Sequence, residues 1–185
     1  MYIARARERG PGRPSRGGGL GLAFVRRARP GRERGFDGNG KGNGMILLVD
    51  DDRRNADLFV EAMRLHGLDH EVVVARDGVE CLGLLFGADH HGGQDLRVAP
   101  SLVLLDLHMP RMGGLETLHR IREDGRTKRL PVVMFSATAF PEDVTDAYRL
   151  GANAFVDKLS TPFPEAVRQI VRFWVRVNRT APLVG

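Results

Sequence analysis

Five short and mostly apolar runs follow one another along residues 45–157, and this repetition limits the possible fold more than any other feature of the sequence. The runs are MILLV (45–49), EVVVA (71–75), LVLLD (102–106), PVVMFS (131–136) and AFVD (154–157). Segments with helical character follow them, at 53–66, 78–86, 113–123, 141–150 and 162–178. Strands that are apolar on both faces and alternate with helices form a parallel sheet covered on both sides. The sequence therefore predicts an α/β domain with a doubly wound, five-stranded parallel sheet flanked by five helices.

The charge divides the chain into two parts. Residues 1–44 hold 11 Lys and Arg and three acids, hence a net charge of +8, together with 12 of the 23 glycines. Residues 45–185 hold 17 Lys and Arg and 20 acids, hence a net charge of −3. A segment such as 1–44 cannot bury enough apolar surface to offset its ordering entropy. We expect a disordered basic extension at 1–44, a domain at 45–178 and a short tail at 179–185. Since the domain itself is acidic, a nucleic-acid interface on it is disfavoured.

Two interpretations of the extension stay open. It is either a basic arm for nucleic acid or an anionic membrane, or an unselected extension in front of a natural start at Met45. We favour the second, because Met45 directly opens the first predicted strand. N-terminal sequencing of the native protein would decide between them. The longest apolar runs are too short to span a membrane, and a lone cysteine, Cys81, cannot form an internal disulfide. We expect a cytoplasmic protein in which Cys81 is a small buried hydrophobic residue.

Polar residues gather where the predicted strands end, which is the edge at which open parallel sheets bind ligands. They are Asp50, Asp51, Asp52, Asp106, Ser136 and Lys158. Carboxylates that converge repel one another unless a cation is present, and Mg²⁺ prefers carboxylate and carbonyl oxygens. A lysine and a hydroxyl suit a phosphoryl group, and an aspartate between metal and lysine can form an acyl phosphate. This chemistry identifies Asp106 as the residue that accepts phosphate.

Simpler interpretations exist for several of these residues. Residues 50–52 could be a solvated acidic cluster at a helix start, although Asp106, Ser136 and Lys158 share the same edge. His108 could shuttle a proton or contact an attacking water, or it could face solvent beside the site.

Residues 45–178 resemble the receiver domain of bacterial two-component response regulators. The matching segments are ILLVDDD, LVLLDLHMPRMGGLE, PVVMFSA and GANAFVDK, in this order, with Ser136 30 residues after Asp106 and Lys158 22 residues after Ser136. The resemblance implies that Asp50 and Asp51 are the acidic pair and that Asp51 is a direct Mg²⁺ ligand. It also implies that Asp106 is the phosphoacceptor and a metal ligand, and that position 108 binds the metal through its backbone carbonyl.

The same resemblance assigns the residues that respond to phosphate. Ser136 supplies the hydroxyl that moves toward the phosphoryl group, Lys158 is the lysine of the family, and Phe155 is the aromatic switch that packs inward. One departure concerns Leu159, because the family has a proline after the lysine, joined by a cis bond. A non-proline cis bond costs roughly 2.5–4 kcal/mol, so this loop either stores strain or is trans.

The last predicted helix indicates a subgroup within this family. It is similar to the last helix of single-domain regulators that partner phytochrome-type histidine kinases. Its apolar residues Val167, Ile170, Trp174 and Val177 form a stripe, which fits either a homodimer through this helix or a core helix. Since seven residues follow Asn178, we expect no DNA-binding domain.

The expected function is reception of a phosphoryl group from a sensor histidine kinase or a phosphotransfer protein, with output through phosphorylation-dependent protein interaction. The expected chemistry is self-phosphorylation and dephosphorylation with Mg²⁺, without further enzymatic activity. Two alternatives remain. A phosphohydrolase with an aspartate nucleophile would need a second acid where His108 stands. A receiver-like scaffold would bind its partner without phosphate.

Overall fold

The computed structural model describes residues 24–27, 44–86 and 100–179. Within these residues, six strands form one sheet, with bounds β1 Phe24–Arg27, β2 Ile46–Val49, β3 Glu71–Ala75, β4 Leu102–Leu105, β5 Val132–Ser136 and β6 Ala154–Asp157. The helices are α1 Arg53–Leu65, α2 Gly78–Phe86, α3 Gly114–Glu123, α4 Pro141–Arg149 and α5 Phe163–Val171, and a π-helix, η1 Arg172–Val177, continues α5.

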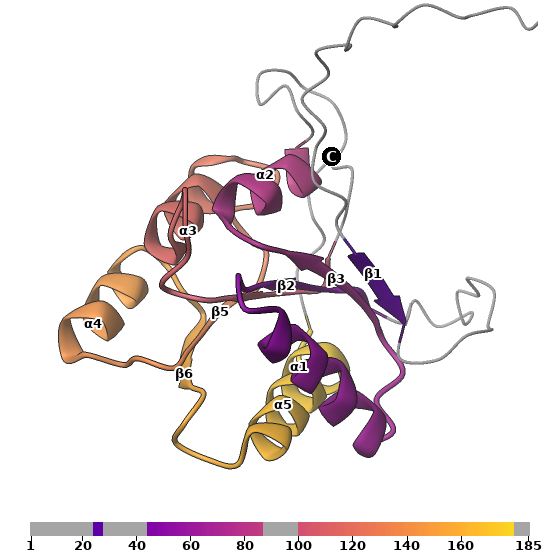
Figure 1. The fold of residues 1–185 in the computed structure, drawn as a ribbon. Coiled ribbons are helices and arrows are strands. Elements are labelled where there is room, and N and C mark those ends of the chain that lie inside the picture. The colour runs from indigo at the N-terminus through magenta and orange to yellow at the C-terminus, as the bar shows by residue number, and fades with distance from the viewer. Residues whose placement is uncertain (1–23, 28–43, 87–99, 180–185) are drawn as a thin grey trace, which may run out of the picture.

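The sheet has the order β1-β3-β2-β4-β5-β6, and all its neighbouring pairs from β3 to β6 are parallel. Helices α1 and α5 lie against one face, and α2 and α3 cover the other (Figure 1). The predicted doubly wound sheet of five parallel strands with five helices is therefore confirmed. Because the strands are parallel, their carboxyl ends meet at one edge, where the predicted site residues follow them.

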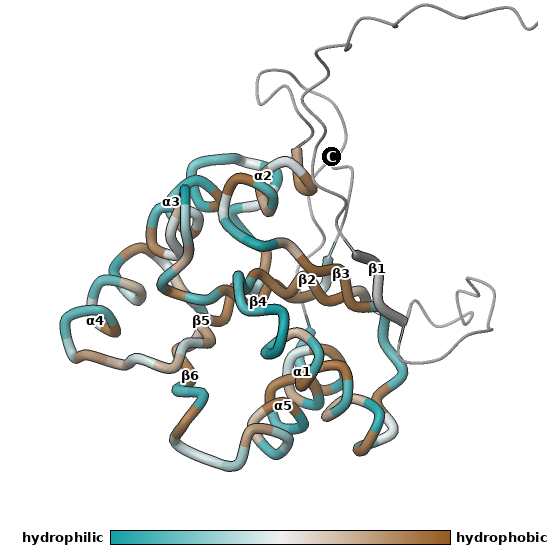
Figure 2. The backbone as a smooth tube through the Cα atoms, in the orientation of Figure 1, coloured by the Kyte–Doolittle hydropathy of each residue, from teal (hydrophilic) through white to brown (hydrophobic). Residues whose placement is uncertain are grey.

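The strands are apolar on both faces because each face has a core of its own. All four residues of β2 and of β4 are buried, and Figure 2 shows this apolar centre between more polar helices. Phe59 of α1 packs in one core and Leu118 of α3 in the other, both fully buried. Burial of such a side chain contributes roughly 1.5–3 kcal/mol. Cys81 is also fully buried, as predicted, and burial raises the pKa of its thiol to about 12.

The prediction that residues 1–44 lack regular structure is wrong for residues 24–27. These residues form β1, which pairs antiparallel with β3, with Phe24 opposite Val74 and Arg27 opposite Glu71. Without β1, the backbone N–H and C=O groups on the outer side of β3 would have no ladder partner, and such an edge readily accepts a further strand. The sheet thus has a sixth, antiparallel strand. The other predictions for 1–44 concern residues outside the described ranges, apart from Gly44.

The predicted last helix is present, but its last turns differ from an α-helix. In η1 the hydrogen bonds span five residues, and the N–H of Asn178 likewise donates to the carbonyl of Phe173 at 2.7 Å. Most of the predicted apolar stripe belongs to the core, with Val167 and Ile170 buried and Trp174 packed against them. Within the described ranges, no helix is both long and apolar enough to cross a membrane.

Candidate phosphoacceptor and metal site

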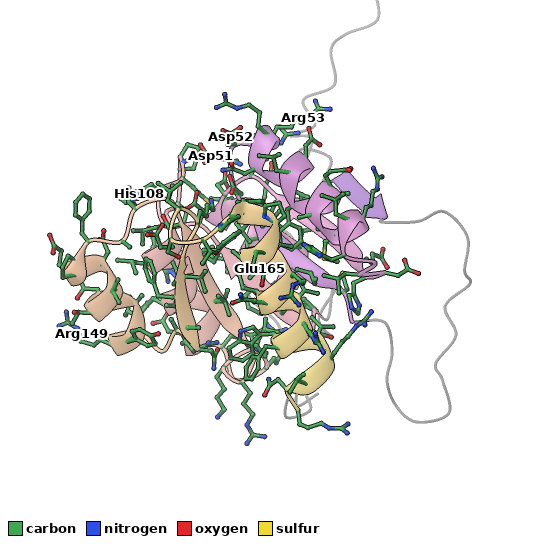
Figure 3. The ribbon with its side chains drawn as sticks, turned by 90° about the horizontal axis from the view of Figure 1, so that it is seen from below. Asp51, Asp52, Arg53, His108, Arg149 and Glu165 are labelled. Carbon is green, nitrogen blue, oxygen red and sulfur yellow. The ribbon has the colours of Figure 1, made fainter. Side chains whose placement is uncertain are left out.

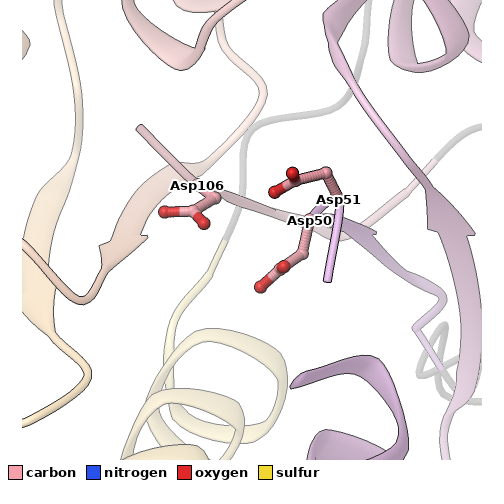
Figure 4. Close-up of side chains that lie close together, drawn as sticks. All are labelled: Asp50, Asp51 and Asp106. Carbon is pink, nitrogen blue, oxygen red and sulfur yellow. The ribbon is translucent and has the colours of Figure 1, made fainter. Parts of the chain in front are cut away.

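Three carboxylates converge at the carboxyl edge of the sheet. Asp50 and Asp51 directly follow β2, and Asp106 directly follows the neighbouring strand β4. One oxygen from each of the three lies within 4.8 Å of the others (Figure 4). Asp50 is buried, Asp106 is half-buried and Asp51 is exposed. The structure therefore brings together the three predicted carboxylates, and hard oxygen donors in this arrangement fit Mg²⁺.

Asp52 has a different role from the other two acids of its run. Its side chain accepts a hydrogen bond from the backbone N–H of Arg54 at 2.9 Å, so it is the N-cap of α1. The Arg54 side chain also donates to it, and these hydrogen bonds lower the pKa of Asp52. The interpretation as a helix-start residue is correct for Asp52 alone.

Lys158 lies between two of the carboxylates. Its Nζ is 2.7 Å from Asp50 Oδ2 and 3.1 Å from Asp106 Oδ2. Lys158 is only 5% exposed, so its interactions are screened less by water than those of a surface ion pair. The strand β6 ends at Asp157, and the backbone N–H of Lys158 donates to the carbonyl of Ser136 at the end of β5. Strand pairing thus places the lysine at this edge.

The buried Asp50 carboxylate is held from several sides. Besides Lys158, it accepts hydrogen bonds from the backbone N–H of Asp52 at 2.9 Å and from Asn55 Nδ2 at 3.1 Å. Burial raises the pKa of Asp50, and the Lys158 ammonium opposes this shift. Sequence analysis did not single out Asn55, which lies in the first turn of the predicted helix at 53–66.

Asp106 is fixed by the backbone around it. Its Oδ1 accepts a hydrogen bond from the N–H of Leu107 at 2.8 Å, and its own N–H donates to the carbonyl of Val49 in β2. Gly114, the first residue of α3, approaches the Asp106 carbonyl so closely that a Cβ there would overlap it. The side chain of Asp106 is therefore held in a defined place while remaining partly exposed, as a nucleophile requires.

Ser136 and His108 lie at the same edge and are connected through Thr138. Thr138 Oγ1 is 3.1 Å from His108 Nδ1 and 3.4 Å from Ser136 Oγ. His108 is exposed and lies at the same end of the domain as Asp51 (Figure 3). Thr138 was missed in the sequence, although a hydroxyl two residues after Ser136 was a possible signal. Since His108 has no carboxyl group, the second acid of a phosphohydrolase is lacking at this position.

Phe155 lies in β6, which β5 separates from β4, the strand that precedes Asp106. It is half-buried and packs against the core on the side of α2 and α3. Its backbone N–H donates to the hydroxyl of Tyr148 in α4 at 3.3 Å. A change in the packing of Phe155 would therefore also be felt at α4.

The loop after Lys158 is trans, since the described segments contain no cis peptide bond. The N–H of Leu159 donates to Asp157 Oδ1 at 2.7 Å, and the Ser160 hydroxyl donates to the Asp157 carbonyl at 2.9 Å. In such a turn, the aspartate side chain accepts the hydrogen bond that a backbone carbonyl accepts in an ordinary turn. A proline at 159 could not donate the first of these bonds. The loop of this protein therefore differs from the loop that the family resemblance implied, in which a cis proline follows the lysine.

Comparisons with known proteins agree with this geometry. The family profile of the response regulator receiver domain matches residues 46–170. The sequence is 32% identical over 134 residues to the response regulator Rcp1 of Synechocystis sp., an alignment that covers 71% of this chain and 88% of Rcp1.

Two solved structures have the same fold. The phosphorylated cyanobacterial phytochrome response regulator RcpA matches with a TM-score of 0.65 and 31% identity, over 74% of this chain and 97% of RcpA. The Mn²⁺-bound form of Rcp1 matches with a TM-score of 0.64 and 28% identity, over 75% of this chain and 99% of that one.

Proposed function

Because the chain belongs to the response regulator receiver domain family of two-component signalling, we propose that Asp106 accepts a phosphoryl group from a histidine of a sensor kinase or phosphotransfer protein. The position of Asp106 carries this proposal, since its half-buried carboxylate contacts Lys158 and lies close to the acidic pair Asp50 and Asp51. In the transfer, an Asp106 oxygen attacks phosphorus, the bond from phosphorus to the donor imidazole breaks, and the imidazole leaves with the bonding electrons.

In this proposal Asp50, Asp51 and Asp106 hold Mg²⁺ together with the backbone carbonyl of His108. The three carboxylates offer the hard oxygen donors that Mg²⁺ prefers. When bound, the ion neutralises the negative charge that gathers on the phosphoryl oxygens.

The side chain of Lys158 stabilises the product of the transfer. Its Nζ already lies 3.1 Å from an Asp106 oxygen, so a short movement pairs it with a phosphoryl oxygen. The Ser136 hydroxyl turns toward the phosphoryl group. It exchanges its weak contact with Thr138, at 3.4 Å, for a stronger hydrogen bond to a phosphoryl oxygen. Phe155 then repacks inward and changes the face formed by α4, β6 and α5.

We further propose that the phosphoryl donor is a phytochrome-type histidine kinase in the cytoplasm. The similarity to a phytochrome response regulator supports the type of donor, and a single, buried free thiol suits a reducing compartment. Output occurs through protein contacts that depend on phosphorylation, and the chemistry is limited to Mg²⁺-dependent gain and loss of the phosphoryl group.

The experiment that tests this function is the intact mass of the full chain after incubation with acetyl phosphate, with and without Mg²⁺. We expect one phosphoryl adduct that requires Mg²⁺ and is lost in Asp106→Asn, because the amide cannot form the acyl phosphate. Asp124→Asn is the control, since Asp124 is also partly exposed but binds Arg126 away from the site. If folded wild-type protein forms no adduct, the proposal fails and phosphate-independent binding becomes the better explanation.

We also propose that the protein forms a homodimer through its C-terminal helix. Phe173 and Val177 are spaced four residues apart in η1, and they are 50% and 62% exposed. Trp174 makes an edge-to-face contact with Phe173 at 5.1 Å between ring centroids and is itself packed on the core. A twofold interface in which this helix meets its own copy would cover both exposed side chains.

We expect sedimentation equilibrium to give a dimer for the full chain and a monomer for Phe173→Glu, because a buried carboxylate at the interface would lack a partner. Leu58→Glu is the matched control, since Leu58 of α1 is 54% exposed and lies outside the proposed interface. A monomeric wild type, or a Phe173→Glu variant that dimerises as strongly as the control, would contradict the interface.

A further inference from the structure

The loop between β4 and α3 has an unusual backbone at Arg111. Arg111 is the one non-glycine residue of the described segments with a positive φ, at 61°. The N–H of Met112 donates to the carbonyl of Pro110 at 2.7 Å, so Arg111 is the central residue of a γ-turn. A γ-turn with positive φ is rare and strained, and side chains other than glycine and asparagine seldom adopt this region. Such a conformation persists where the surrounding structure enforces it.

The side chain of Arg111 attaches this turn to α2. Its guanidinium donates to the carboxylate of Asp77, which is 1% exposed, and Arg111 Nη2 is 3.5 Å from Glu80 Oε1. The other oxygen of Asp77 accepts the backbone N–H of Glu80 at 3.0 Å in the first turn of α2. One buried carboxylate therefore both caps α2 and holds the turn of the neighbouring loop.

Backbone contacts hold the same loop at both of its ends. Next to Arg111, the N–H of Gly78 in α2 donates to the carbonyl of Met112 at 3.1 Å. At the other end, Leu107 donates its N–H to Asp106 Oδ1 and accepts the N–H of Gly114 at its carbonyl. The residues between these ends include His108, whose carbonyl is a proposed metal ligand.

We propose that Arg111 is a positioning residue of the metal and phosphoacceptor site, acting through the loop 107–113. The ion pair with Asp77 holds the strained turn in place, and the turn in turn sets the place of the His108 carbonyl and of the Leu107 N–H that orients Asp106. This inference rests on the proposed function, because it concerns the same Mg²⁺ site.

Titration of the full chain with Mg²⁺ alone, followed by calorimetry, tests the inference. We expect Arg111→Ala and Arg111→Gly to bind Mg²⁺ about tenfold more weakly or worse, the size of effect seen when groups that orient metal ligands are removed. Glycine adopts a positive φ without steric cost, so Arg111→Gly removes the ion pair without adding strain. With acetyl phosphate, the adduct should also form more slowly in both variants, because the Leu107 N–H that orients Asp106 shifts with the turn.

Arg120→Ala is the matched control. Arg120 lies on α3, is 55% exposed compared with 54% for Arg111, and also faces two carboxylates, those of Glu116 and Glu123. It should bind Mg²⁺ like the wild type. Thermal unfolding of each variant establishes that the titrated protein is folded. If Arg111 only stabilised the fold, a folded Arg111 variant would bind Mg²⁺ with wild-type affinity.

Wild-type affinity in a folded Arg111→Gly variant would overturn the inference and leave the proposed function intact. An equal loss of affinity in Arg120→Ala would also overturn it. The loss would then come from the change in net charge and not from the contact of Arg111 with Asp77. If the wild type itself bound no Mg²⁺ and formed no adduct, the proposed function would fall and this inference with it.

Discussion

Replacing Lys158 with alanine is expected to lower the free energy of unfolding of the metal-free protein by about 3–5 kcal/mol, the usual cost of breaking a buried ion pair on one side. The Nζ of Lys158 contacts both Asp50 and Asp106, and Asp50 is only 3% exposed. Without the lysine, two carboxylates that repel each other lose the cation between them. Chemical denaturation in the presence of a chelator measures this effect.

The pH dependence of the Lys158→Ala variant follows from the same geometry. Burial already raises the pKa of Asp50, and loss of Lys158 removes the interaction that opposes this shift. A carboxyl group whose pKa is higher in the folded than in the unfolded state takes up a proton on folding. The stability of the variant relative to wild type should therefore be greatest below the unfolded pKa and fall as the pH rises through the folded pKa of Asp50.

Two further proteins make the test of Lys158 specific. Adding Asp50→Asn to Lys158→Ala should restore much of the lost stability, because the buried charge is then removed. Lys128→Ala, at an exposed lysine, should change the stability by less than about 0.5 kcal/mol. Equal stability of Lys158→Ala and wild type would show that the buried lysine does not offset the repulsion of the carboxylates.

Replacing Gly114 with alanine is expected to destabilise the protein by about 3 kcal/mol and to slow formation of the phosphoryl adduct. A Cβ at Gly114 would overlap the backbone carbonyl of Asp106 and lie 2.9 Å from Met134 Cε. Overpacking of this kind costs about 1–3 kcal/mol, and here the obstacle is backbone, which cannot rotate away. The strand end that carries Asp106 would have to shift.

Gly125→Ala is the control for Gly114→Ala. A Cβ at Gly125 would have open space around it, and its φ is not in the left-handed region, so alanine should be neutral or slightly stabilising. Chemical denaturation and the rate of adduct formation should both be measured for the two variants. An adduct that forms at the wild-type rate in Gly114→Ala would show that the start of α3 can move without disturbing Asp106.

The sequence allowed the fold to be predicted because its strands are apolar on both faces. The runs at 46–49 and 102–105 are fully buried, so their composition directly reflects two covering layers. The site followed from the same reasoning, since parallel strands bring Asp50 and Asp106 to one edge whatever the details of the loops. The family resemblance is confirmed by the match over residues 46–170.

Features that depend on long-range contacts could not be predicted. The strand at 24–27 lies in a segment rich in Gly and Arg, and its pairing depends on the free edge of β3 rather than on its own composition. The link between Arg111 and Asp77 joins residues 34 positions apart, and no periodic pattern reports such a pair. The contact of Thr138 with His108 likewise joins residues 30 positions apart that follow two different strands.

The pairing of β1 with β3 has a practical consequence for any shortened form of this protein. A chain that begins at Met45 loses more than a tail, because it also loses the outer neighbour of β3 and leaves the backbone groups on that side to water or to another molecule. Self-association through this bared strand could then be mistaken for pairing through the C-terminal helix. Oligomeric state is therefore best measured on the whole 185-residue chain, in which β1 already pairs with β3.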